Sequence, residues 1–334
     1  MRAWQIQTPT GIDGLKMAEL RPIEPGPGEV RVRNRASSIN YRDLSVVSDP
    51  AARGIALPRI PNSDGAGEVL AAGAGVTEFA PGDRVAGCFF QDWGDGACTP
   101  EAMASALGGA LDGMLAEEVT VSAGGLVKIP GHLSYAEAAT LPCAALTAWR
   151  ALVDVGRVKA GDRVLLLGTG GVSIFALQFA GLMGARVIIT SSSDEKLARA
   201  KSLGAWQTVN YRRSPDWEEA VLELTEGRGV DLTVEVGGAG TLEKSIAATR
   251  IAGTIGLIGV LSGGTINPRP IMAKSITLQG IYVGSRRLFQ DMNRAIAASE
   301  LRPVIDRTFA FEEAPEAYRA MQAAGHFGKL VIEV

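Results

Sequence analysis

The residues with the clearest chemical meaning form a glycine-rich turn at positions 168–173, which read Gly-Thr-Gly-Gly-Val-Ser. The turn follows a continuous apolar run at 163–167 and precedes a segment with helical spacing. Gly168 permits a tight turn, and Gly170 lets the backbone approach a pyrophosphate, which the N-terminus of a helix attracts. Ser173 replaces the third glycine of this pattern and is small enough for close helix–strand packing. Because the turn lies between a strand and a helix, we predict dinucleotide binding rather than a purely structural turn.

The residues after the next strand bear on the choice between NAD and NADP. An NAD site usually has a carboxylate there, which accepts a hydrogen bond from the ribose 2′-hydroxyl. In this chain Ser191 and Ser192 occupy the place, and the first carboxylate, Asp194, fits better in the first turn of the following helix. Serine hydroxyls with Lys196 and Arg212 nearby suit a 2′-phosphate, although both basic residues could be solvated surface charges. We therefore predict NADP rather than NAD.

The glycine turn belongs to a pattern of alternating strands and helices. After the run at 163–167, strand-like segments occupy 186–189, 207–210, 231–236, 254–259 and 277–283. Between them we expect helices at 172–183, 194–203 and 241–250, and one that starts at Ser214-Pro215. This alternation predicts a doubly wound parallel α/β sheet.

The first 130 residues have a different pattern, in which Gly and Pro interrupt short strand-like runs. Such a pattern predicts a partly closed β-barrel or a sandwich. Residues 91–113 are expected to form a long loop, and Ser134 with Glu137 makes a capping box that predicts the start of a helix. From residue 288 on, we expect further helices and a final strand at 329–333.

The composition limits the class of protein. The 334 residues include 33 Lys and Arg against 36 Asp and Glu, so the net charge is −3. That charge gives no electrostatic basis for binding nucleic acid or an anionic membrane, and the length suggests two domains. Three cysteines without a CxxC pair, no membrane-spanning apolar run and no signal-peptide pattern lead us to expect a cytoplasmic protein.

Several motifs outside the glycine turn indicate a family. They are Ser-Ile-Asn-Tyr-Arg-Asp at 38–43, Asp-Gly-Ala-Gly-Glu-Val at 64–69, Pro-Gly-Asp-Arg-Val at 81–85, Ala-Ala-Thr-Leu-Pro at 138–142 and His-Phe-Gly-Lys at 326–329. With them the chain resembles the medium-chain dehydrogenase/reductase family over essentially its full length. The resemblance implies a GroES-like catalytic domain at 1–128 and 285–334, a Rossmann NADP-binding domain at 129–284, and an active-site cleft between the two.

Other motifs point to a branch of this family. Asn40-Tyr41, Gly-Ala-Trp-Gln at 204–207 and Asn-Tyr-Arg at 210–212 are similar to NADPH-dependent quinone reductases, and Phe-Phe-Gln-Asp-Trp at 89–93 resembles a subgroup often described as zinc-independent alcohol dehydrogenases. The resemblance implies an NADPH-dependent enzyme that transfers hydride to quinones or other conjugated carbonyls. Two alternatives stay open: a zinc-independent alcohol dehydrogenase or ketone reductase, and a non-catalytic NADPH-binding protein comparable to the lens crystallin relatives.

Zinc can be considered position by position. In the zinc-dependent branch a Cys stands at the position of Asn40, a His at that of Ser63 and a Cys at that of Cys143. A catalytic zinc needs three protein ligands and an open position, so we interpret Cys143 as a packing residue. A structural zinc lobe needs four closely spaced cysteines, and its region offers only Cys98. We therefore predict that the protein holds no zinc.

The resemblance also implies further cofactor contacts. The pyrophosphate would lie against the turn that holds Gly168, Thr169, Gly170, Gly171 and Val172. The adenosine 2′-phosphate would be near Ser191, Ser192, Lys196 and Tyr211, and the nicotinamide half near Gly259, Val260, Leu261, Gly284 and Ser285. Lys329 falls where the family often has a basic residue near the phosphates. Tyr211 could instead be a packing aromatic, and Lys329 a surface charge on the last strand.

Without zinc, hydrogen-bond donors must stabilise the negative charge that develops on the oxygen of a reduced substrate. Asn40 has an amide donor and replaces a zinc ligand, so it is the first candidate for a catalytic contact. Tyr41 could donate a proton or only pack, and Arg42 could bind cofactor phosphate or face solvent. Asp43 is expected to anchor the loop. Quinone reduction can take its proton from solvent, so no strong general acid is required.

The expected strand at 277–283 is apolar and would end the parallel sheet. Because an exposed edge strand must be protected, and because family members pair there, we expect a homodimer.

Overall fold

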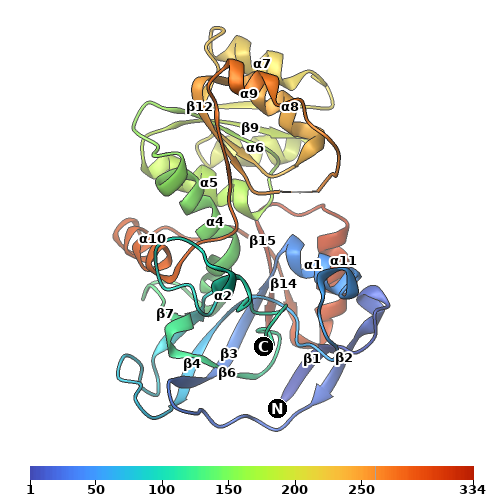
Figure 1. The fold of residues 1–334 in the computed structure, drawn as a ribbon, viewed down its shortest axis with the longest axis vertical. Coiled ribbons are helices and arrows are strands. Elements are labelled where there is room, and N and C mark those ends of the chain that lie inside the picture. Colours follow the sequence, from blue (N-terminus) through green and yellow to red (C-terminus); the bar gives the residue numbers. More distant parts are fainter. Residues whose placement is uncertain (260) are drawn as a thin grey trace. The chain divides into compact units, whose positions relative to one another are not determined.

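A computed structural model describes residues 1–259 and 261–334. The chain forms two compact units, unit 1 from Met1–Leu146 with Val283–Val334, and unit 2 from Thr147–Tyr282. Unit 1 is discontinuous because the chain leaves it for unit 2 and returns (Figure 1). The boundaries of these units differ from the expected domain ranges at 129–146 and at 283–284, which both belong to unit 1. In the first of these segments, α3 (Tyr135–Ala138) lies against strands β3 (Glu29–Ile39) and β4 (Asp64–Ala72), and the π-helical turn η4 (Leu141–Ala145) lies against β4 and β5 (Arg84–Gly87).

Among the described residues of unit 2, six parallel strands form a sheet in the order β10-β9-β8-β11-β12-β13. Their bounds are β8 (Arg163–Leu166), β9 (Arg186–Ser191), β10 (Gln207–Asn210), β11 (Val230–Glu235), β12 (Thr249–Leu257) and β13 (Thr277–Gly280). The strand order reverses between β8 and β11, which is the switch point at which doubly wound sheets bind ligands. The prediction of a doubly wound parallel sheet is confirmed.

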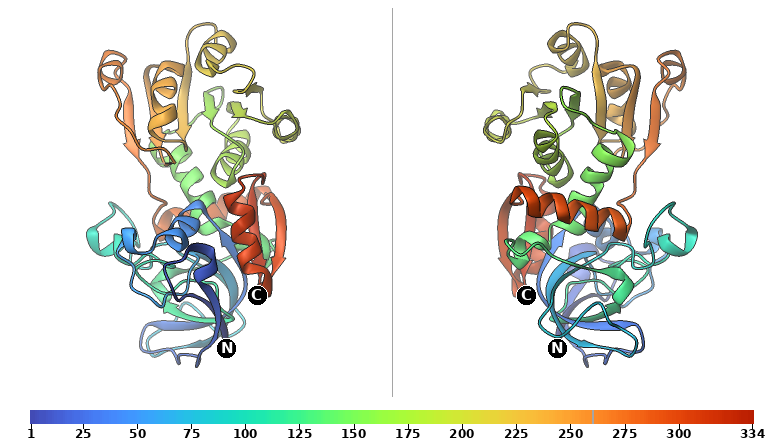
Figure 2. Two further views of the ribbon diagram at one scale, coloured as in Figure 1. Left: turned by 90° about the vertical axis from the view of Figure 1, so that its right-hand side faces the viewer. Right: turned by 90° about the vertical axis from the view of Figure 1, so that its left-hand side faces the viewer.

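Helices cover both faces of this sheet (Figure 2). They are α5 (Gly171–Leu182), α6 (Asp194–Ser202), α7 (Trp217–Leu224) and α8 (Ala239–Ala248), with the short α9 (Arg269–Ala273) before β13; α4 (Leu146–Trp149) and the π-helical η5 (Arg150–Val155) precede β8. Buried aliphatic strand residues such as Leu165 and Ile188 form one of the cores together with Trp217.

Several element boundaries in unit 2 differ from the sequence prediction. The helix expected at Ser214-Pro215 begins at Trp217, because the backbone N–H of Ser214 donates to the carbonyl of Asn210 and keeps this segment in a turn. Strand β12 starts earlier than expected, at Thr249, and β13 ends at Gly280 rather than at 283.

Unit 1 contains a mainly antiparallel sheet that matches the expected GroES-like barrel. Within the described residues its strand order is β14-β15-β3-β4-β5-β7, with β6 also paired to β3, and β1 and β2 form a separate hairpin. The bounds are β1 (Arg2–Ile6), β2 (Leu15–Glu19), β3 (Glu29–Ile39), β4 (Asp64–Ala72), β5 (Arg84–Gly87), β6 (Glu118–Ser122), β7 (Leu126–Lys128), β14 (Ile305–Ala310) and β15 (Lys329–Glu333). Alternate residues of β3, among them Val30 and Val32, point into the apolar core.

The helices of unit 1 are short apart from α10. Their bounds are α1 (Tyr41–Ser48), α2 (Pro100–Met103), α10 (Arg286–Ser299) and α11 (Ala314–Gln322), and single turns are η1 (Gly11–Gly14), η2 (Ala51–Arg53), η3 (Ala123–Gly125) and η6 (Phe311–Glu313). The predicted capping box is confirmed, since the Ser134 Oγ accepts from the N–H of Glu137 and the Glu137 carboxylate accepts from the N–H of Ser134. The expected long loop at 91–113 is interrupted only by α2 and isolated bridges. No helix in the described residues is both long and apolar enough to cross a membrane.

Candidate active site

Asn40 lies where β3 ends and α1 begins, and only 8% of it is exposed. Its backbone N–H donates to Oδ2 of Asp43 at 2.9 Å. The other carboxylate oxygen of Asp43, Oδ1, accepts from the N–H of Ser63 at 3.2 Å. The buried Asp43 carboxylate therefore joins the start of α1 to the segment before β4, which is the anchoring role expected of it.

Lys329, at the start of β15, reaches the same place because β15 pairs antiparallel with β3, with Leu330 opposite Ile39. Its Nζ donates to the carbonyl of Ile39 at 2.8 Å and to Oδ1 of Asn40 at 2.6 Å. Lys329 is only 3% exposed, so the alternative that it is a surface charge is wrong. Burial lowers the pKa of Lys329, and the carboxylate of Asp64 opposes that shift.

Asp64, at the start of β4, completes a buried polar cluster in unit 1. Its Oδ1 accepts from Ser63 Oγ at 2.7 Å, and its Oδ2 accepts from Ser38 Oγ at 3.3 Å and from the N–H of Cys143 at 3.2 Å. Burial raises the pKa of Asp64, and the positive charge of Lys329 works against this rise. We call Asn40, Asp43, Ser63, Asp64 and Lys329 the Asn40 cluster.

The two residues after Asn40 differ in accessibility. Tyr41, in the first turn of α1, is 54% exposed. Arg42 instead is largely buried, and its guanidinium lies 4.3 Å from the centre of the Phe89 ring. It donates from Nη1 to the carbonyl of Gly108 at 2.9 Å and from Nη2 to the carbonyl of Leu107. These bonds tie α1 to the loop at 91–113 and favour a structural role for Arg42 over contact with a cofactor phosphate or with solvent.

In unit 2 the glycine turn has the geometry that phosphate binding requires. Gly168 has a φ of 69°, which side-chain-bearing residues rarely adopt. Gly170 is the N-cap residue of α5 and makes no side-chain capping bond, so the first N–H groups of the helix are not used by a cap. A Cβ at Gly168 or Gly170 would meet no atom within 4 Å. The backbone is therefore open to a close ligand, with Thr169, Gly171 and Val172 beside it.

Ser173 shows how the missing third glycine is accommodated. Its Oγ donates to the carbonyl of Leu167 at 2.7 Å, and the residue is buried. The hydroxyl thus binds the end of β8 and holds the first turn of α5 close to it. The prediction that a small residue preserves this packing is confirmed.

The residues expected near the adenosine end gather at the carboxyl ends of β9 and β10. The N–H of Tyr211 donates to the carbonyl of Ser191 at 3.1 Å, and the Tyr211 ring is exposed. Ser192 and Lys196 are half-buried nearby. Asp194 is the first residue of α6, and its carboxylate accepts from Asn210 Nδ2 at 2.7 Å and pairs with Arg213. Asp194 therefore belongs to the helix, as expected.

The residues expected near the nicotinamide have mixed surroundings. A Cβ on Gly259 would lie 1.6 Å from the carbonyl oxygen of Val236, so only glycine fits there, and Leu261 is 54% exposed. Val260 lies outside the described residues. Gly284 packs against Leu146 in unit 1, and a Cβ there would be 3.0 Å from the Leu146 Cγ. Ser285 caps α10 through its Oγ and is buried, so both have structural reasons for their identity.

Glu235, at the end of β11, is a buried residue that the sequence reasoning missed. Its Oε1 accepts from the N–H groups of Gly237 and Gly238 at 2.7 and 3.1 Å, and from Thr241 Oγ1 at 2.7 Å, while Oε2 accepts from Ser245 Oγ. It thereby holds the turn that follows β11 at the carboxyl edge of the sheet. A carboxylate between the apolar residues Val234 and Val236 of the expected strand was the available signal.

Comparison with known proteins now identifies the family. Residues 26–131 match the alcohol dehydrogenase GroES-like domain, and residues 171–298 match the zinc-binding dehydrogenase domain. A zinc-type alcohol dehydrogenase-like protein of Schizosaccharomyces pombe is 43% identical, with 97% of this chain and 96% of the relative covered. The chain belongs to the medium-chain dehydrogenase/reductase family.

The names of other relatives indicate different activities. A quinone oxidoreductase of Pseudomonas aeruginosa is 32% identical, with 96% of each chain covered. A solved structure named NAD-dependent alcohol dehydrogenase is 37% identical, with a TM-score of 0.92 and all of both chains covered. The family and an oxidoreductase activity with a nicotinamide cofactor are thus shared, while the names of the relatives indicate different substrates.

Asn40 and Ser63 of the Asn40 cluster, together with Cys143, are the residues that the sequence resemblance aligned with zinc ligands of the zinc-dependent branch. Asn40 Nδ2 lies 3.5 Å from Ser63 Oγ, and Cys143 joins the cluster through its backbone N–H. Burial raises the pKa of the Cys143 thiol, and Asp64 adds to the rise. Throughout residues 1–259 and 261–334, no three His, Cys, Asp or Glu side chains are grouped to hold a metal ion.

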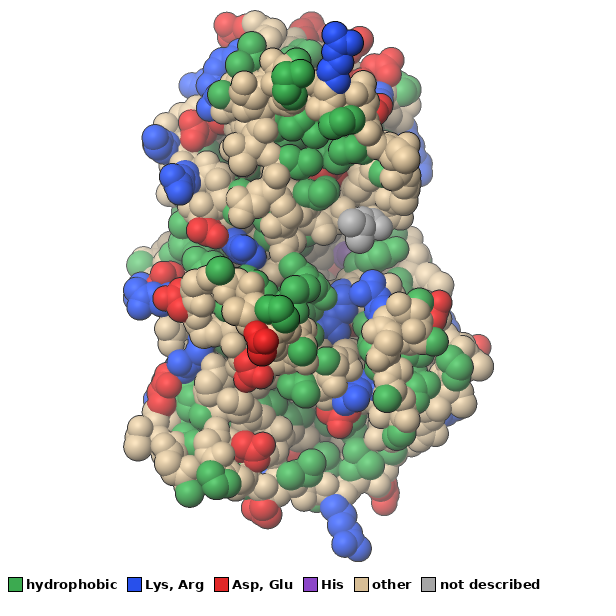
Figure 3. Space-filling view, in the orientation of Figure 1, with side chains coloured by type: hydrophobic (Ala, Val, Ile, Leu, Met, Phe, Trp, Pro, Cys, Tyr) green, Lys and Arg blue, Asp and Glu red, His purple; other side chains and the backbone are tan. Residues whose placement is uncertain are grey.

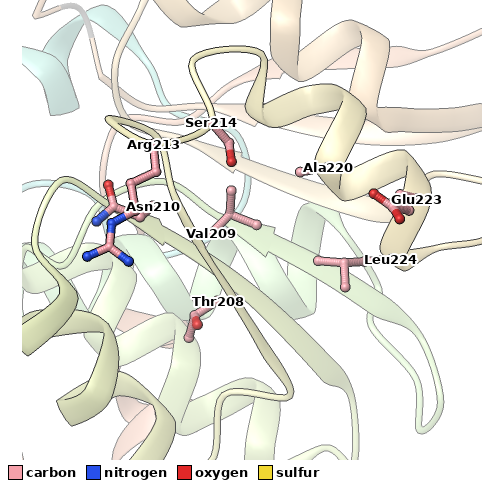
Figure 4. A pocket seen from close by; sticks show the side chains of 8 residues that line it. All are labelled: Thr208, Val209, Asn210, Arg213, Ser214, Ala220, Glu223 and Leu224. Carbon is pink, nitrogen blue, oxygen red and sulfur yellow. The ribbon is translucent and has the colours of Figure 1, made fainter.

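Unit 2 also has a surface groove of about 560 Å³ beside the edge strand β10. Figure 4 shows its lining from β10, the following turn and α7: Thr208, Val209, Asn210, Arg213, Ser214, Ala220, Glu223 and Leu224. None of the residues of the glycine turn lines it, so this groove is not the candidate cofactor site.

Proposed function

We propose that this member of the family is an NADPH-dependent, zinc-free oxidoreductase that transfers hydride to quinones or other conjugated carbonyls. The observation that carries the proposal is the contact between Lys329 Nζ and Asn40 Oδ1 at 2.6 Å. It puts a lysine ammonium beside an amide at a position that provides a zinc ligand in the zinc-dependent branch.

The donor set at this position does not fit zinc. The three aligned residues are an amide, a hydroxyl and a thiol whose pKa is raised by burial, whereas zinc prefers thiolate, imidazole or carboxylate ligands. A nearby ammonium would also repel a dication. No step of the proposed reaction therefore passes through a metal.

The residues of unit 2 fit a dinucleotide. The open backbone at Gly168 and Gly170 and the uncapped start of α5 suit a pyrophosphate. Ser191, Ser192, Lys196 and Tyr211 support NADP, because none is a carboxylate that would repel the 2′-phosphate. When bound, NADPH supplies the hydride.

In unit 1, Asn40 provides the polar chemistry. Hydride addition to a quinone or enone leaves negative charge on the carbonyl oxygen, and a preorganised N–H donor lowers the barrier to its formation. The Nδ2 amide group of Asn40 would donate to that oxygen. The proton that completes the reduction comes from solvent, and the exposed hydroxyl of Tyr41 is a second possible source.

The test is NADPH consumption with quinones, enals, enones and ketones, before and after treatment with a metal chelator. We expect turnover of quinones or enones that chelation leaves unchanged, and a lower KM for NADPH than for NADH. Loss of activity on chelation would overturn the zinc-free assignment, and a preference for NADH would overturn the cofactor assignment.

A zinc-free alcohol dehydrogenase or ketone reductase is the second candidate, and the word alcohol in the names of two relatives favours that substrate class. Oxidation of simple alcohols with NADP, in the absence of quinone turnover, would replace the first proposal with this one. Absence of turnover across both panels, with NADPH still bound, would indicate the non-catalytic alternative.

We also propose a cytoplasmic homodimer that binds neither nucleic acid nor membranes. In the described residues β13 pairs only with β12, and Thr277, Gln279 and Gly280 are exposed, so one edge of the sheet is open to a second copy. On the face in Figure 3, basic and acidic side chains are interspersed. Cys88 and Cys143 form no disulfide bond, which suits a reducing compartment. Light scattering at micromolar concentration is expected to report a dimer, and a monomer would contradict it.

A further inference from the structure

The contact between Lys329 and Asn40 determines which way the Asn40 amide points. A lysine ammonium has three donors and no acceptor, so the atom of Asn40 that it meets at 2.6 Å must be the carbonyl oxygen. The opposite orientation would place an NH₂ group against the ammonium, with no hydrogen bond and like partial charges in contact. The Nδ2 group must therefore face away from Lys329.

The other side of the amide is consistent with this orientation. Nδ2 lies 3.5 Å from Ser63 Oγ, at the limit of a hydrogen bond. Ser63 Oγ donates its own proton to Asp64 Oδ1 at 2.7 Å, so it can only accept from Asn40. Asp64 also takes a hydrogen bond from the Asn40 side chain, so the long contact with Ser63 is the Nδ2 interaction that a substrate oxygen can replace.

Lys329 itself is held firmly in the cluster. It is 3% exposed and makes a second bond, to the carbonyl of Ile39 at 2.8 Å. Asp64 and Asp43 are the acidic groups that act on its charge. A buried, charge-assisted hydrogen bond of this kind is stronger than a neutral one and can hold the amide against rotation.

We propose that Lys329 is a positioning residue that orients the Asn40 amide, so that Nδ2 is presented to the substrate oxygen. This inference rests on the proposed function, in which Asn40 contacts the substrate. It differs from the expectation that Lys329 binds a cofactor phosphate, because it makes Lys329 act on the chemical step through Asn40.

The two roles predict different kinetics for Lys329→Met, which keeps the length of the side chain and removes its donors. If Lys329 is a positioning residue, Lys329→Met should lower the kcat for quinone about 30-fold and change the KM and Kd for NADPH less than about twofold. If Lys329 is instead a phosphate ligand, the same variant should raise the KM and Kd for NADPH with little change in kcat. That second outcome would overturn the proposal.

A double-mutant cycle tests whether the effect passes through Asn40. If it does, Asn40→Ala with Lys329→Met should be no slower than Asn40→Ala alone, within about threefold. Asn40→Asp keeps an oxygen for Lys329 but removes the Nδ2 donor, and should be as slow as Asn40→Ala. Multiplicative losses in the double variant, or wild-type rates for Asn40→Asp, would contradict the proposal.

Conservative and remote substitutions provide the controls. Lys329→Arg retains a side chain that can only donate and should keep at least about a tenth of the wild-type kcat, so it also serves if Lys329→Met does not fold. Equal losses in folded Lys329→Arg and Lys329→Met would argue against orientation. Lys128→Met, at an exposed lysine of β7 that pairs with Asp83, should leave all constants unchanged.

The inference and the proposed function fail in different ways. If the wild-type protein reduces no acceptor, the proposed function fails. The coupling between Lys329 and Asn40 is then measured by thermal unfolding. The losses in Tm for Lys329→Met and Asn40→Ala should be less than additive in the double variant if the two groups are coupled. Additive losses would overturn the positioning role independently of any activity.

Discussion

The glycine turn of unit 2 and the Asn40 cluster of unit 1 are built in opposite ways. The turn is made of backbone from six consecutive residues, and its essential features are a positive φ at Gly168 and the free end of α5. The Asn40 cluster is made of side chains that β3, β4 and β15 bring together from positions as distant in sequence as Asn40 and Lys329. The comparison teaches that a site made of backbone depends on a short stretch of sequence, whereas a site made of side chains depends on strand pairing.

The two units also shift the pKa of a carboxylate in opposite directions. Asp64 in unit 1 lies in a buried polar cluster, and its pKa is raised by burial despite Lys329. In unit 2, burial would likewise raise the pKa of Asp231, but hydrogen bonds from Arg228, the N–H of Arg163 and Arg250 outweigh it and hold that pKa well below its usual range. The first carboxylate organises a site, and the second stabilises the sheet.

The largest expected effect tests the role of the glycine turn in cofactor binding. Gly170→Asp should raise the KM for NADPH about 100-fold, because the new carboxylate would repel the pyrophosphate and block the approach of the backbone. Since a Cβ at this position meets nothing within 4 Å, the Tm should be nearly unchanged. Steady-state kinetics and thermal unfolding measure the two quantities.

The matched control for that variant is Gly181→Ala, in the same helix and also with open space around its Cβ. It should leave the KM for NADPH unchanged. A similar KM for NADPH in Gly170→Asp and wild type would show that the turn is only structural.

The next effect tests the difference between the carboxylates. Asp231→Asn should destabilise the protein by about 2 kcal/mol at pH 7, because Arg228 and Arg250 lose a charged acceptor. The folded-state pKa of Asp231 lies below its ordinary value of 3.8, so its contribution is present above that value and is lost as the pH falls through the folded-state pKa. Thermal unfolding across pH 2–7 measures the difference.

The expected pH dependence has the opposite sign for Asp64. Its folded-state pKa is raised, so its contribution to the free energy of unfolding is greatest below 3.8 and is lost as the pH rises through the raised value.

Asp154→Asn, at an exposed carboxylate paired with Arg150, is the control for Asp231→Asn and should cost less than about 0.5 kcal/mol. A cost for Asp231→Asn that stays constant down to pH 2 would contradict the assignment.

The smallest expected effect concerns cofactor preference. Ser191→Asp should lower the ratio of kcat/KM for NADPH to that for NADH about tenfold, since a carboxylate there repels a 2′-phosphate and accepts from a ribose hydroxyl. Kinetics with both cofactors measure the ratio, and Ser202→Asp, at an exposed serine at the end of α6, is the control. An unchanged ratio in Ser191→Asp would remove Ser191 from the predicted 2′-phosphate site.

Much of the fold could be predicted because its signals are local. The strand at 207–210 and the final strand at 329–333 have the bounds that the sequence indicated, since Thr and Val in the first and Val and Ile in the second favour strands. The start of α7 could not be predicted from Ser214-Pro215, because a hydrogen bond from Ser214 to Asn210 continues the turn up to Trp217. The place of 129–146 in unit 1 likewise depends on packing against β4 and β5.

The candidate site was predictable in part for the same reason. Asn40, Ser63 and Cys143 were named individually from motifs, but their link through Asp64 and Lys329 required the pairing of β15 with β3. Arg42 was likewise named from a motif, but its bonds to the carbonyls of Leu107 and Gly108, in the loop at 91–113, became evident only from the tertiary structure.

The sequence by itself determined the doubly wound sheet, the glycine turn and the absence of the histidine and one of the cysteines that zinc-dependent relatives use, because periodicity, backbone freedom and ligand chemistry are properties of residue type. The tertiary structure alone decided what replaces those ligands. Only when β15 lies beside β3 does Lys329 meet Asn40, and a lysine that can only donate then determines the direction of the amide.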